Sequence, residues 1–380
     1  MAFPPAPDPQ SKLQRYRRLA PSAGVYVSPL QLGGMSIGNS WAMGSGGKED
    51  AFKLMDAFFD AGGNFIDTAN GYHGGQSEEW IGEWVEKRKI REQVVIATKF
   101  TDSPYRFGGG PTPTINNAAL LGNSAKSLTS SLDISLRRLQ MSYVDILYVH
   151  WWDYSTSVEE MMNALHNVVV QGKVLFLGAS NMPAWVVADA NRYAKCMGKT
   201  PFVIYQGAWN ILSRDFERDT IPMARAHGMA LAPWNIFQQG KIRTDAEEEE
   251  RKKNGQGGRL GWGSSWERTE DQKKLCRALE KVAAETGARS IRAVAIAYLM
   301  HKTTHVFPLL GVRNIDQLNE NVSALDVHLA PEHMTYLESI LPFEPGAPHD
   351  HLGDGTRPVG STRAAIVIDW DQVPQPIRLP

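Results

Sequence analysis

The stretch Asn64-Phe65-Ile66-Asp67, followed one helical segment later by Val94-Val95-Ile96-Ala97-Thr98-Lys99, decides the fold of this chain. Each is a short apolar run that ends on a charged residue, and Tyr72 lies shortly after Asp67. A third run, Val144 to Val149, ends on His150. Polar residues at successive strand ends meet only if the strands are parallel neighbours, because the carboxyl ends of parallel strands share one edge of the sheet.

Short apolar runs of this kind alternate with amphipathic segments along the chain. The expected strands are 30–34, 63–68, 94–99, 143–150, 174–179, 202–206, 229–233 and 306–310, and the expected helices are 49–61, 76–88, 120–139, 158–171, 183–197, 217–227, 271–286 with 290–302, and 314–325. Such alternation predicts parallel strands joined by crossover helices. Eight units favour an α/β fold of the (β/α)8 TIM barrel type. An open doubly wound sheet is the alternative, but the G-x-G-x-x-G turn usual there does not occur in this sequence.

The composition narrows the class of partner. The 380 residues carry a net charge of -1 and are 42% hydrophobic, so neither a nucleic-acid nor an acidic-membrane partner is expected. Two cysteines, Cys196 and Cys276, without Cys/His clusters at metal spacing, favour neither a disulfide framework nor a metal site. No signal peptide and no membrane-spanning run is recognised. The sequence predicts a cytoplasmic protein.

The two ends of the chain and one internal segment differ from the regular alternation. Residues 1–15 are Pro-rich and expected to be flexible, and 16–29 predict a β-hairpin ahead of the barrel, whose domain is taken as 16–340. Residues 242–269 are charged and Gly-rich and predict a solvated insertion after the seventh strand. The long C-terminal tail, 341–380, is expected either to cross the barrel mouth or to wrap the outside.

The polar residues at the strand ends form a set suited to proton transfer: Asp67, Tyr72, Lys99 and His150. Each alone has an ordinary explanation, since an aspartate there often caps a helix and a single aromatic commonly packs half-buried. Together they match one chemistry. A tyrosine has a pKa of about 10, and a neighbouring ammonium lowers it. We expect Tyr72 to be the proton donor, with Lys99 held by Asp67 and His150 bonded to a carbonyl oxygen.

None of these side chains can supply hydride, so a cofactor is required. Ser180 and Asn181 end the fifth strand and Gln206 the sixth, where they can bind a carboxamide. Trp234 ends the seventh strand, where its ring can stack on a nicotinamide. Core packing is the alternative for this tryptophan.

A phosphate site is expected where Gly311-Val312-Arg313 leads into the last helix. A free helix N-terminus beside a guanidinium suits a phosphate monoester, which favours NADP over NAD. Lys241 could add a second cation. A capping arrangement of Asn314 with Gln317 is the alternative.

These motifs resemble those of the aldo-keto reductases. The similarity covers about 16–330 and is carried by Leu32-Gly33-Gly34-Met35-Ser36, Asp67-Thr68-Ala69-Asn70-Gly71-Tyr72, Ile96-Ala97-Thr98-Lys99, Tyr148-Val149-His150-Trp151, Gly178-Ala179-Ser180-Asn181, and Gly311-Val312-Arg313 with Glu320-Asn321. Within that family, His150-Trp151-Trp152-Asp153 and Gly240-Lys241-Ile242-Arg243-Thr244 resemble the fungal aryl-alcohol dehydrogenases and norsolorinic acid reductase-like proteins.

The resemblance implies a barrel with NADP(H) across its mouth and assigns roles by position. Asp67, Tyr72, Lys99 and His150 would be catalytic. The cofactor would contact Gly34, Met35, Ser36, Asp67, Ser180, Asn181, Gln206, Trp234, Lys241, Gly311, Arg313, Gln317, Glu320 and Asn321. Trp41, Trp151 and Trp152 would contact substrate. Two positions depart from the family pattern: Trp234, where tyrosine is more common, and the run from Pro233 to Gly240.

Three functions follow as expectations. The first is an NADP(H)-dependent oxidoreductase interconverting aldehydes or ketones, mainly aromatic, with alcohols. The second is a pathway-specific reductase of a polyketide ketone, and the third is a cofactor-binding subunit similar to those of potassium channels. A monomer or weak homo-oligomer with a small-molecule substrate is expected.

Overall fold

The computed structural model describes residues 4, 6–42, 44–108, 116–255, 265–369 and 375–377. Its centre is a sheet of parallel strands in the order β10-β3-β4-β5-β6-β7-β8-β9. The strands are β3 (Gln31–Gly33), β4 (Phe65–Asp67), β5 (Val95–Phe100), β6 (Val144–Val149), β7 (Val174–Ser180), β8 (Phe202–Ala208), β9 (Ala230–Trp234) and β10 (Leu309–Leu310). Each expected strand is present, and the expected (β/α)8 TIM barrel is confirmed.

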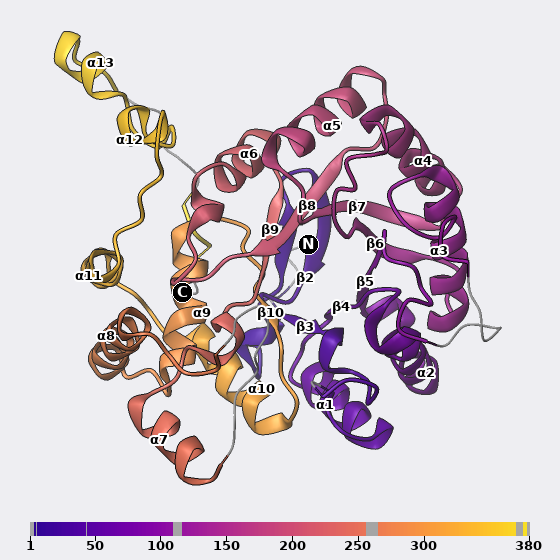
Figure 1. The fold of residues 1–380 in the computed structure, drawn as a ribbon, viewed down its shortest axis with the longest axis horizontal. Helices are drawn as coiled ribbons and strands as arrows, with labels where there is room; N and C mark the ends of the chain where they lie inside the picture. Colours follow the sequence, from indigo (N-terminus) through magenta and orange to yellow (C-terminus); the bar gives the residue numbers. More distant parts are fainter. Residues whose placement is uncertain are drawn as a thin grey trace.

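The barrel closes between β9 and the residues just before β10. Leu231 donates its N–H to the carbonyl of His305 at 2.9 Å and accepts the N–H of Phe307 at 2.8 Å. This parallel bridge joins the two ends of the sheet. Figure 1 shows the strands at the centre and the helices around them.

The helices form the outer layer. They are α1 (Lys48–Asp60), α2 (Gln76–Arg88), α3 (Ala125–Leu139), α4 (Val158–Val170), α5 (Ala184–Cys196), α6 (Thr220–His227), α7 (Asp245–Lys253), α8 (Glu270–Thr286), α9 (Ile291–Lys302), α10 (Ile315–Val322), α11 (Pro331–Ile340), α12 (His349–Leu352) and α13 (Gly360–Ala365). The expected helix 120–139 begins later, at Ala125, because Ser124 caps it by accepting the N–H of Ser127. The expected helix 314–325 ends at Val322 and continues as a 3-10 turn.

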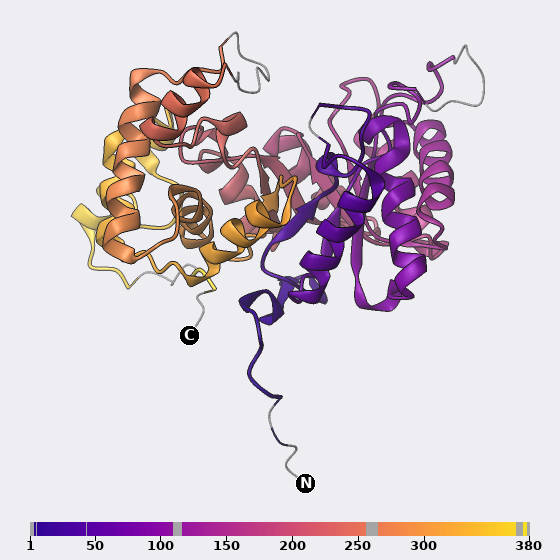
Figure 2. The same ribbon diagram turned by 90° about the horizontal axis from the view of Figure 1, so that it is seen from below.

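An N-terminal hairpin closes one end of the barrel, as expected for 16–29. Strands β1 (Arg17–Ala20) and β2 (Ala23–Val27) pair antiparallel. Leu19 and Val27 are fully buried and pack in one cluster with interior side chains such as Phe65 and Ile146. Figure 2 shows the N-terminal segment leaving the body of the protein beyond this hairpin.

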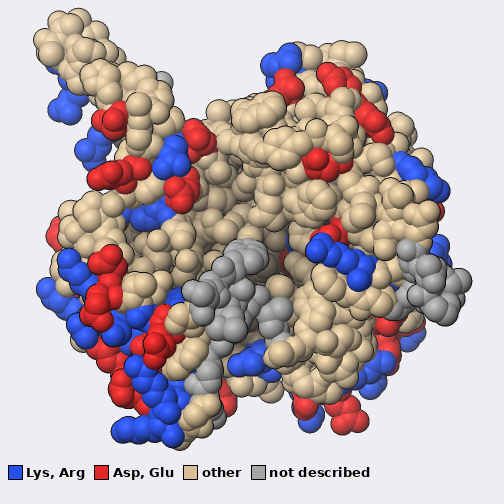
Figure 3. All heavy atoms as spheres, in the orientation of Figure 1, with Lys and Arg blue, Asp and Glu red and all other residues tan. Residues whose placement is uncertain are grey.

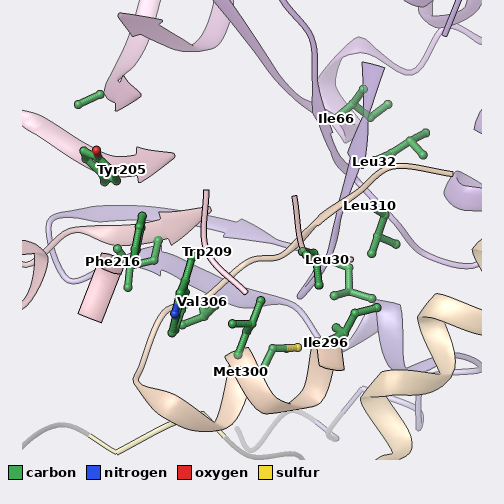
Figure 4. Close-up of a cluster of buried hydrophobic side chains, with 14 of the residues drawn as sticks. Leu30, Leu32, Ile66, Tyr205, Trp209, Phe216, Ile296, Met300, Val306 and Leu310 are labelled. Carbon is green, nitrogen blue, oxygen red and sulfur yellow. The ribbon is translucent and has the colours of Figure 1, made fainter. Parts of the chain in front are cut away.

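A second buried cluster lies between the strands and the helices. Figure 4 shows Ile296 and Met300, one turn apart on α9, close to Leu30 and Val306 of the sheet side. Burial of side chains of this size stabilises the fold by about 1.5–3 kcal/mol each. Apolar contact of this kind therefore holds α9 against the sheet.

The segment 242–269 corrects the expectation of a solvated insertion. Its described part contains α7, whose capping box joins Thr244 and Glu247. Glu248 is 2% exposed and accepts hydrogen bonds from Arg243 Nη2 at 2.6 Å and Arg268 Nε at 2.6 Å. Glu249 and Glu250 are exposed, so one carboxylate of the acidic run is buried as the centre of an ion cluster.

The C-terminal tail, where described, contacts outer elements. Arg218 donates to the carbonyl of Pro345 at 2.5 Å, and its guanidinium lies 5.4 Å from the ring centre of Phe343. Arg225 of α6 donates to the carbonyl of Asp354 at 3.2 Å. Figure 1 shows α12 and α13 projecting away from the barrel. Both expectations for 341–380, crossing the mouth or wrapping the outside, stay predictions.

Candidate active site

The expected catalytic residues continue the inward-facing rows of the barrel. Side chains alternate along a strand, so every second residue points inward. Phe65 in the interior is followed by Asp67, Ala97 by Lys99, and Tyr148 by His150, which comes directly after β6. The paired strands put these ends at one level, since Lys99 lies opposite Tyr148 and Asp67 opposite Ala97. The fold therefore brings the three side chains together at the carboxyl ends of the strands.

Lys99 is the centre of the set. Its ammonium lies 2.5 Å from Asp67 Oδ1, 2.6 Å from the carbonyl oxygen of Thr68 and 3.4 Å from the hydroxyl oxygen of Tyr72. Lys99 and Asp67 are both 0% exposed. The other carboxylate oxygen of Asp67 accepts the amide of Gln206 at 2.8 Å. The ion pair is thus fully enclosed, and the hydroxyl of Tyr72 is hydrogen-bonded to its ammonium from the following loop.

The electrostatics keep Lys99 charged and Tyr72 protonated. Burial acts to lower the pKa of Lys99, but Asp67 and Tyr72 raise it, and the net direction is upward. Burial raises the pKa of Tyr72 and Lys99 lowers it, with a net direction above the ordinary value. The expected lowering by Lys99 is therefore present but is outweighed by burial. In this state the phenol holds its proton beside a permanent positive charge.

His150 also lies close to the phenol. Its ring centre lies 6.0 Å from that of Tyr72 at an interplanar angle of 75°, and its side chain is 17% exposed. Burial and the charge of Lys99 lower the pKa of His150 to about 3. The imidazole is therefore neutral. Its Nδ1 lies 3.9 Å from Asp102 Oδ2, and no hydrogen-bond partner for it occurs among the described residues.

The loop that carries Tyr72 is held by a tight turn. Tyr72 begins a 3-10 segment in which His73, Gly74 and Gly75 all have positive φ, at 53°, 67° and 100°. Arg138 of α3 donates to the carbonyl of Asn70 at 2.7 Å and to the carbonyl of Pro104, in the loop after β5, at 3.0 Å. The turn and this guanidinium fix where the phenol lies.

The residues expected to bind a carboxamide end the next two strands. Ser180 and Gln206 are paired in register across β7 and β8 and are almost fully buried. Asn181 has φ of 47°, and its amide nitrogen donates to Ser180 Oγ and the carbonyl of His150, both at 3.0 Å. Donor and acceptor atoms thus lie together beside His150, which fits a planar amide. Trp234 is half-buried at the end of β9.

The expected phosphate end lies at the start of α10. Arg313 is exposed, and it has no ion-pair partner among the described residues. The capping alternative is also present, since Asn314 Oδ1 accepts the N–H of Gln317 at 2.9 Å, and Gln317 Oε1 accepts the N–H of Arg313 at 3.0 Å. Gly311 is exposed and its surroundings are open. A helix N-terminus beside an unpaired guanidinium fits an anion.

Three other residues expected to contact the cofactor are already hydrogen-bonded within the protein or buried. The ammonium of Lys241 donates to the carbonyls of Ser265, at 2.8 Å, and Glu267. Glu320 accepts from Arg292 at 2.9 Å, and Asn321 is 2% exposed. Figure 3 shows this charged region, over α7 and α8, as a mixture of basic and acidic side chains. Lys241 as a second phosphate cation therefore stays a prediction.

Comparison with known proteins shows which family the chain resembles. The model of the aldo/keto reductase family matches residues 29–342. The chain is 55% identical over 356 residues to an aryl-alcohol dehydrogenase [NADP(+)] of Phanerodontia chrysosporium, covering 93% of this chain and 92% of the relative. It is 52% identical to a putative aryl-alcohol dehydrogenase of Saccharomyces cerevisiae, over 97% and 99% of the two chains. It is 44% identical to norsolorinic acid reductase B of Dothistroma septosporum, over 96% and 94%.

The chain belongs to the aldo/keto reductase family. It is an oxidoreductase that acts on carbonyl or alcohol groups. In this aldo/keto reductase no helix of the described residues is long and apolar enough to cross a membrane. Nor does any group of three His, Cys, Asp or Glu within the described ranges have the arrangement of a metal site.

The first loop of this aldo/keto reductase contains Gly34, Met35 and Ser36. A Cβ at Gly34 would lie 2.7 Å from the carbonyl oxygen of Asp67, so the backbone must pass close to the catalytic strand here. Ser36 is 6% exposed, and the carbonyl of Met35 accepts from the ring of His73 at 3.1 Å. This loop is thereby joined to the segment that carries the phenol.

Of the three tryptophans expected at the substrate, Trp41 is the one in contact with the phenol. Its ring centre lies 6.1 Å from that of Tyr72. Trp152 instead pairs with Tyr154 at 6.4 Å, and the carbonyl of Trp151 accepts from Asn123 at 3.0 Å. Trp151 and Trp152 therefore remain predictions.

Two aromatic residues beside Trp41 were not anticipated. Phe107 lies edge-on to Trp41 at 5.1 Å, and His73 stacks on the indole at 4.7 Å. Their part in the site depends on loops that come together only in the fold. The sequence signal that could have pointed to His73 is its position directly after Tyr72.

Proposed function

We propose that this aldo/keto reductase uses NADP(H) to interconvert aromatic aldehydes or ketones and the corresponding alcohols, with Tyr72 as the proton donor and acceptor. The observation that carries the proposal is the buried Lys99–Asp67 pair with the Tyr72 hydroxyl 3.4 Å from the ammonium. A protonated phenol beside a fixed positive charge can give up its proton to a developing alkoxide without leaving an uncompensated anion.

Each of the other residues has a distinct task in this scheme. Asp67 holds Lys99 in place and keeps it charged although both side chains are fully buried. Neutral His150 can donate one hydrogen bond to a carbonyl oxygen without competing for the proton, since its pKa of about 3 prevents protonation near neutral pH. The substrate oxygen would thus lie between the imidazole and the phenol, whose ring centres are 6.0 Å apart. In the alcohol-oxidising direction the same phenol accepts the proton.

A nicotinamide cofactor would supply the hydride. Ser180, Asn181 and Gln206 would hold its carboxamide, and Trp234 would stack on the ring. Arg313 and the start of α10 would take the phosphate that distinguishes NADP from NAD. The name of the 55% identical relative, an NADP(+) enzyme, supports this choice.

The aromatic preference has two supports. The relatives at 55% and 52% identity are named aryl-alcohol dehydrogenases. Trp41 and Phe107 form an aromatic corner beside Tyr72, which favours flat apolar rings through stacking and edge contacts.

A second candidate is a pathway-specific reductase of a polyketide ketone. This candidate is supported by the 44% identity to norsolorinic acid reductase B. The two candidates share the chemistry at Tyr72 and differ in the substrate alone. Turnover of simple benzaldehydes at high kcat/KM favours the first, whereas turnover confined to a large polycyclic ketone favours the second.

The proposal is tested by following NADPH absorbance with the purified chain and a substituted benzaldehyde. The expected result is NADPH-dependent reduction, with NADH much less effective, and the reverse reaction with the corresponding benzyl alcohol and NADP. Tight NADPH binding without turnover of any aldehyde or ketone would contradict the enzymatic proposal and favour a cofactor-binding subunit instead.

A further inference from the structure

We propose that His73 is a specificity-determining positioning residue: its imidazole, held in one tautomer, fixes Trp41 beside Tyr72 and so makes the site select flat aromatic substrates. This inference rests on the proposed function. It concerns a residue that belongs to neither the expected catalytic set nor the expected cofactor-contact set, and that acts through the indole of Trp41.

Both ring nitrogens of His73 are engaged by the loop that precedes α1. Nδ1 accepts the backbone N–H of Trp41 at 3.1 Å, and Nε2 lies 3.1 Å from the carbonyl oxygen of Met35. A nitrogen that accepts an N–H carries no proton, so the proton is on Nε2 and donates to Met35. This neutral tautomer is the one that satisfies both contacts.

The imidazole is also enclosed. His73 is 2% exposed, and a Cβ at Gly38 would come within 2.4 Å of its ring, so the loop passes directly over it. Gly38 has φ of 144°, a conformation that glycine adopts readily. The loop therefore wraps around a ring that has no space to turn.

The same short segment adds a second tie to the loop. Gln76, the first residue of α2, accepts the N–H of Asn39 at 2.7 Å. The stretch from Tyr72 to Gln76 thus carries the catalytic phenol and also holds the loop that bears Trp41. Phenol and indole are positioned by one piece of backbone.

His73 decides which part of the indole faces the substrate. The imidazole stacks on Trp41 with ring centres 4.7 Å apart and an interplanar angle of 27°. One face of the indole is therefore covered. The indole also lies near the phenol of Tyr72 and the ring of Phe107, with ring centres 6.1 Å and 5.1 Å away. A planar ring fits this corner, while a small aliphatic aldehyde gains little from it.

Burial lowers the pKa of His73, and the carbonyl of Met35 acts against this. The direction agrees with the neutral ring that the hydrogen bonds require.

The test compares kcat/KM for a substituted benzaldehyde and for propanal, with NADPH, in the wild type and in His73→Ala, Trp41→Ala and the double variant. We expect the benzaldehyde-to-propanal ratio to fall about 10- to 100-fold in each single variant, mainly through a higher KM for benzaldehyde. The double variant should be no worse than Trp41→Ala, because residues that act through one contact are non-additive. NADPH affinity should be unchanged in Trp41→Ala.

Two further variants separate positioning from general damage. His73→Asn should restore part of the ratio, because its amide oxygen can accept the N–H of Trp41 and asparagine tolerates positive φ. Trp185 is exposed on α5, and Trp185→Ala should leave kcat/KM unchanged for both aldehydes. If His73→Ala proves too unstable to assay, Trp41→Ala and His73→Asn still decide the question.

An unchanged ratio in Trp41→Ala, or additive losses in the double variant, would overturn the inference. Absence of turnover of either aldehyde by the wild type would instead contradict the proposed function. The two failures are therefore distinguishable.

Discussion

The ammonium of Lys99 lies 3.4 Å from the hydroxyl oxygen of Tyr72, and this separation joins a buried ion pair to an ionisable phenol. The lysine does not lower the pKa of the phenol below its ordinary value, because burial acts more strongly in the other direction. Its role is to stabilise the phenolate once the proton has left. The following predictions test this arrangement and its surroundings.

Removing one partner of the buried pair should destabilise the fold. Lys99→Met leaves Asp67 enclosed without its cation, and we expect a loss of about 3–5 kcal/mol in the free energy of unfolding. The double variant Lys99→Met with Asp67→Asn should recover most of it, since no uncompensated charge remains. Urea denaturation measures the free energy of unfolding of each variant. Both variants should show almost no aldehyde reduction. A double variant that is active, or as unstable as the single one, would contradict this role.

The neutral state of His150 predicts a specific pH dependence. Its pKa is about 3 in the folded protein, against about 6.5 in the unfolded chain. The folded state therefore binds fewer protons between these values, so the contribution of this group to stability is complete above about pH 6.5 and is lost as the pH falls toward 3. Relative to His150→Gln, the wild type should lose stability between pH 7 and pH 4 in denaturant titrations. An NMR titration of His150 with a midpoint near 6.5 would show that the imidazole is not shielded.

Arg313 should control discrimination between the two cofactors. Arg313→Ala removes a charge-assisted contact to the expected phosphate, worth about 1.5–3 kcal/mol, so NADPH affinity should fall about 10- to 100-fold with little change for NADH. Lys126→Ala, an exposed lysine on α3, serves as the control. Quenching of tryptophan fluorescence measures binding independently of turnover. Equal losses for both cofactors would argue against a phosphate contact at this position.

The ion cluster around Glu248 should be structural. Glu248→Gln leaves Arg243 and Arg268 without their shared carboxylate, and a loss of about 3–5 kcal/mol is expected. Glu249→Gln, one position along but exposed, should change stability by no more than about 0.5 kcal/mol. Thermal unfolding of the two variants gives the comparison. Similar melting temperatures would mean that the cluster contributes little.

The sequence anticipated the parts of the site that local periodicity fixes. Asp67 and Lys99 end inward-facing rows of apolar residues, so their meeting follows from strand alternation and parallel pairing. Helix beginnings with a capping serine depend on equally local signals, as at Ser157, which accepts the N–H of Glu160 three positions further along. These signals depend on neighbours along the chain.

The features that escaped prediction depend on distant partners. Glu248 looked like one member of a solvated acidic run, because its buried partner Arg268 is twenty positions further along. Helix α11 was not predicted, since Ala330 stands before it and offers no side-chain cap. The role proposed for His73 depends on its contact with Trp41. These two residues are far apart in the sequence, so their spacing does not predict that they meet.

The measurement that tests the central claim most directly is single-turnover reduction of a substituted benzaldehyde by NADPH in the wild type and Tyr72→Phe. The change removes one hydroxyl and leaves the ring, so cofactor affinity should stay within about threefold while the rate of the chemical step falls about 10²–10⁴-fold. A variant that binds NADPH normally and reduces the aldehyde at the wild-type rate would show that the proton comes from another group.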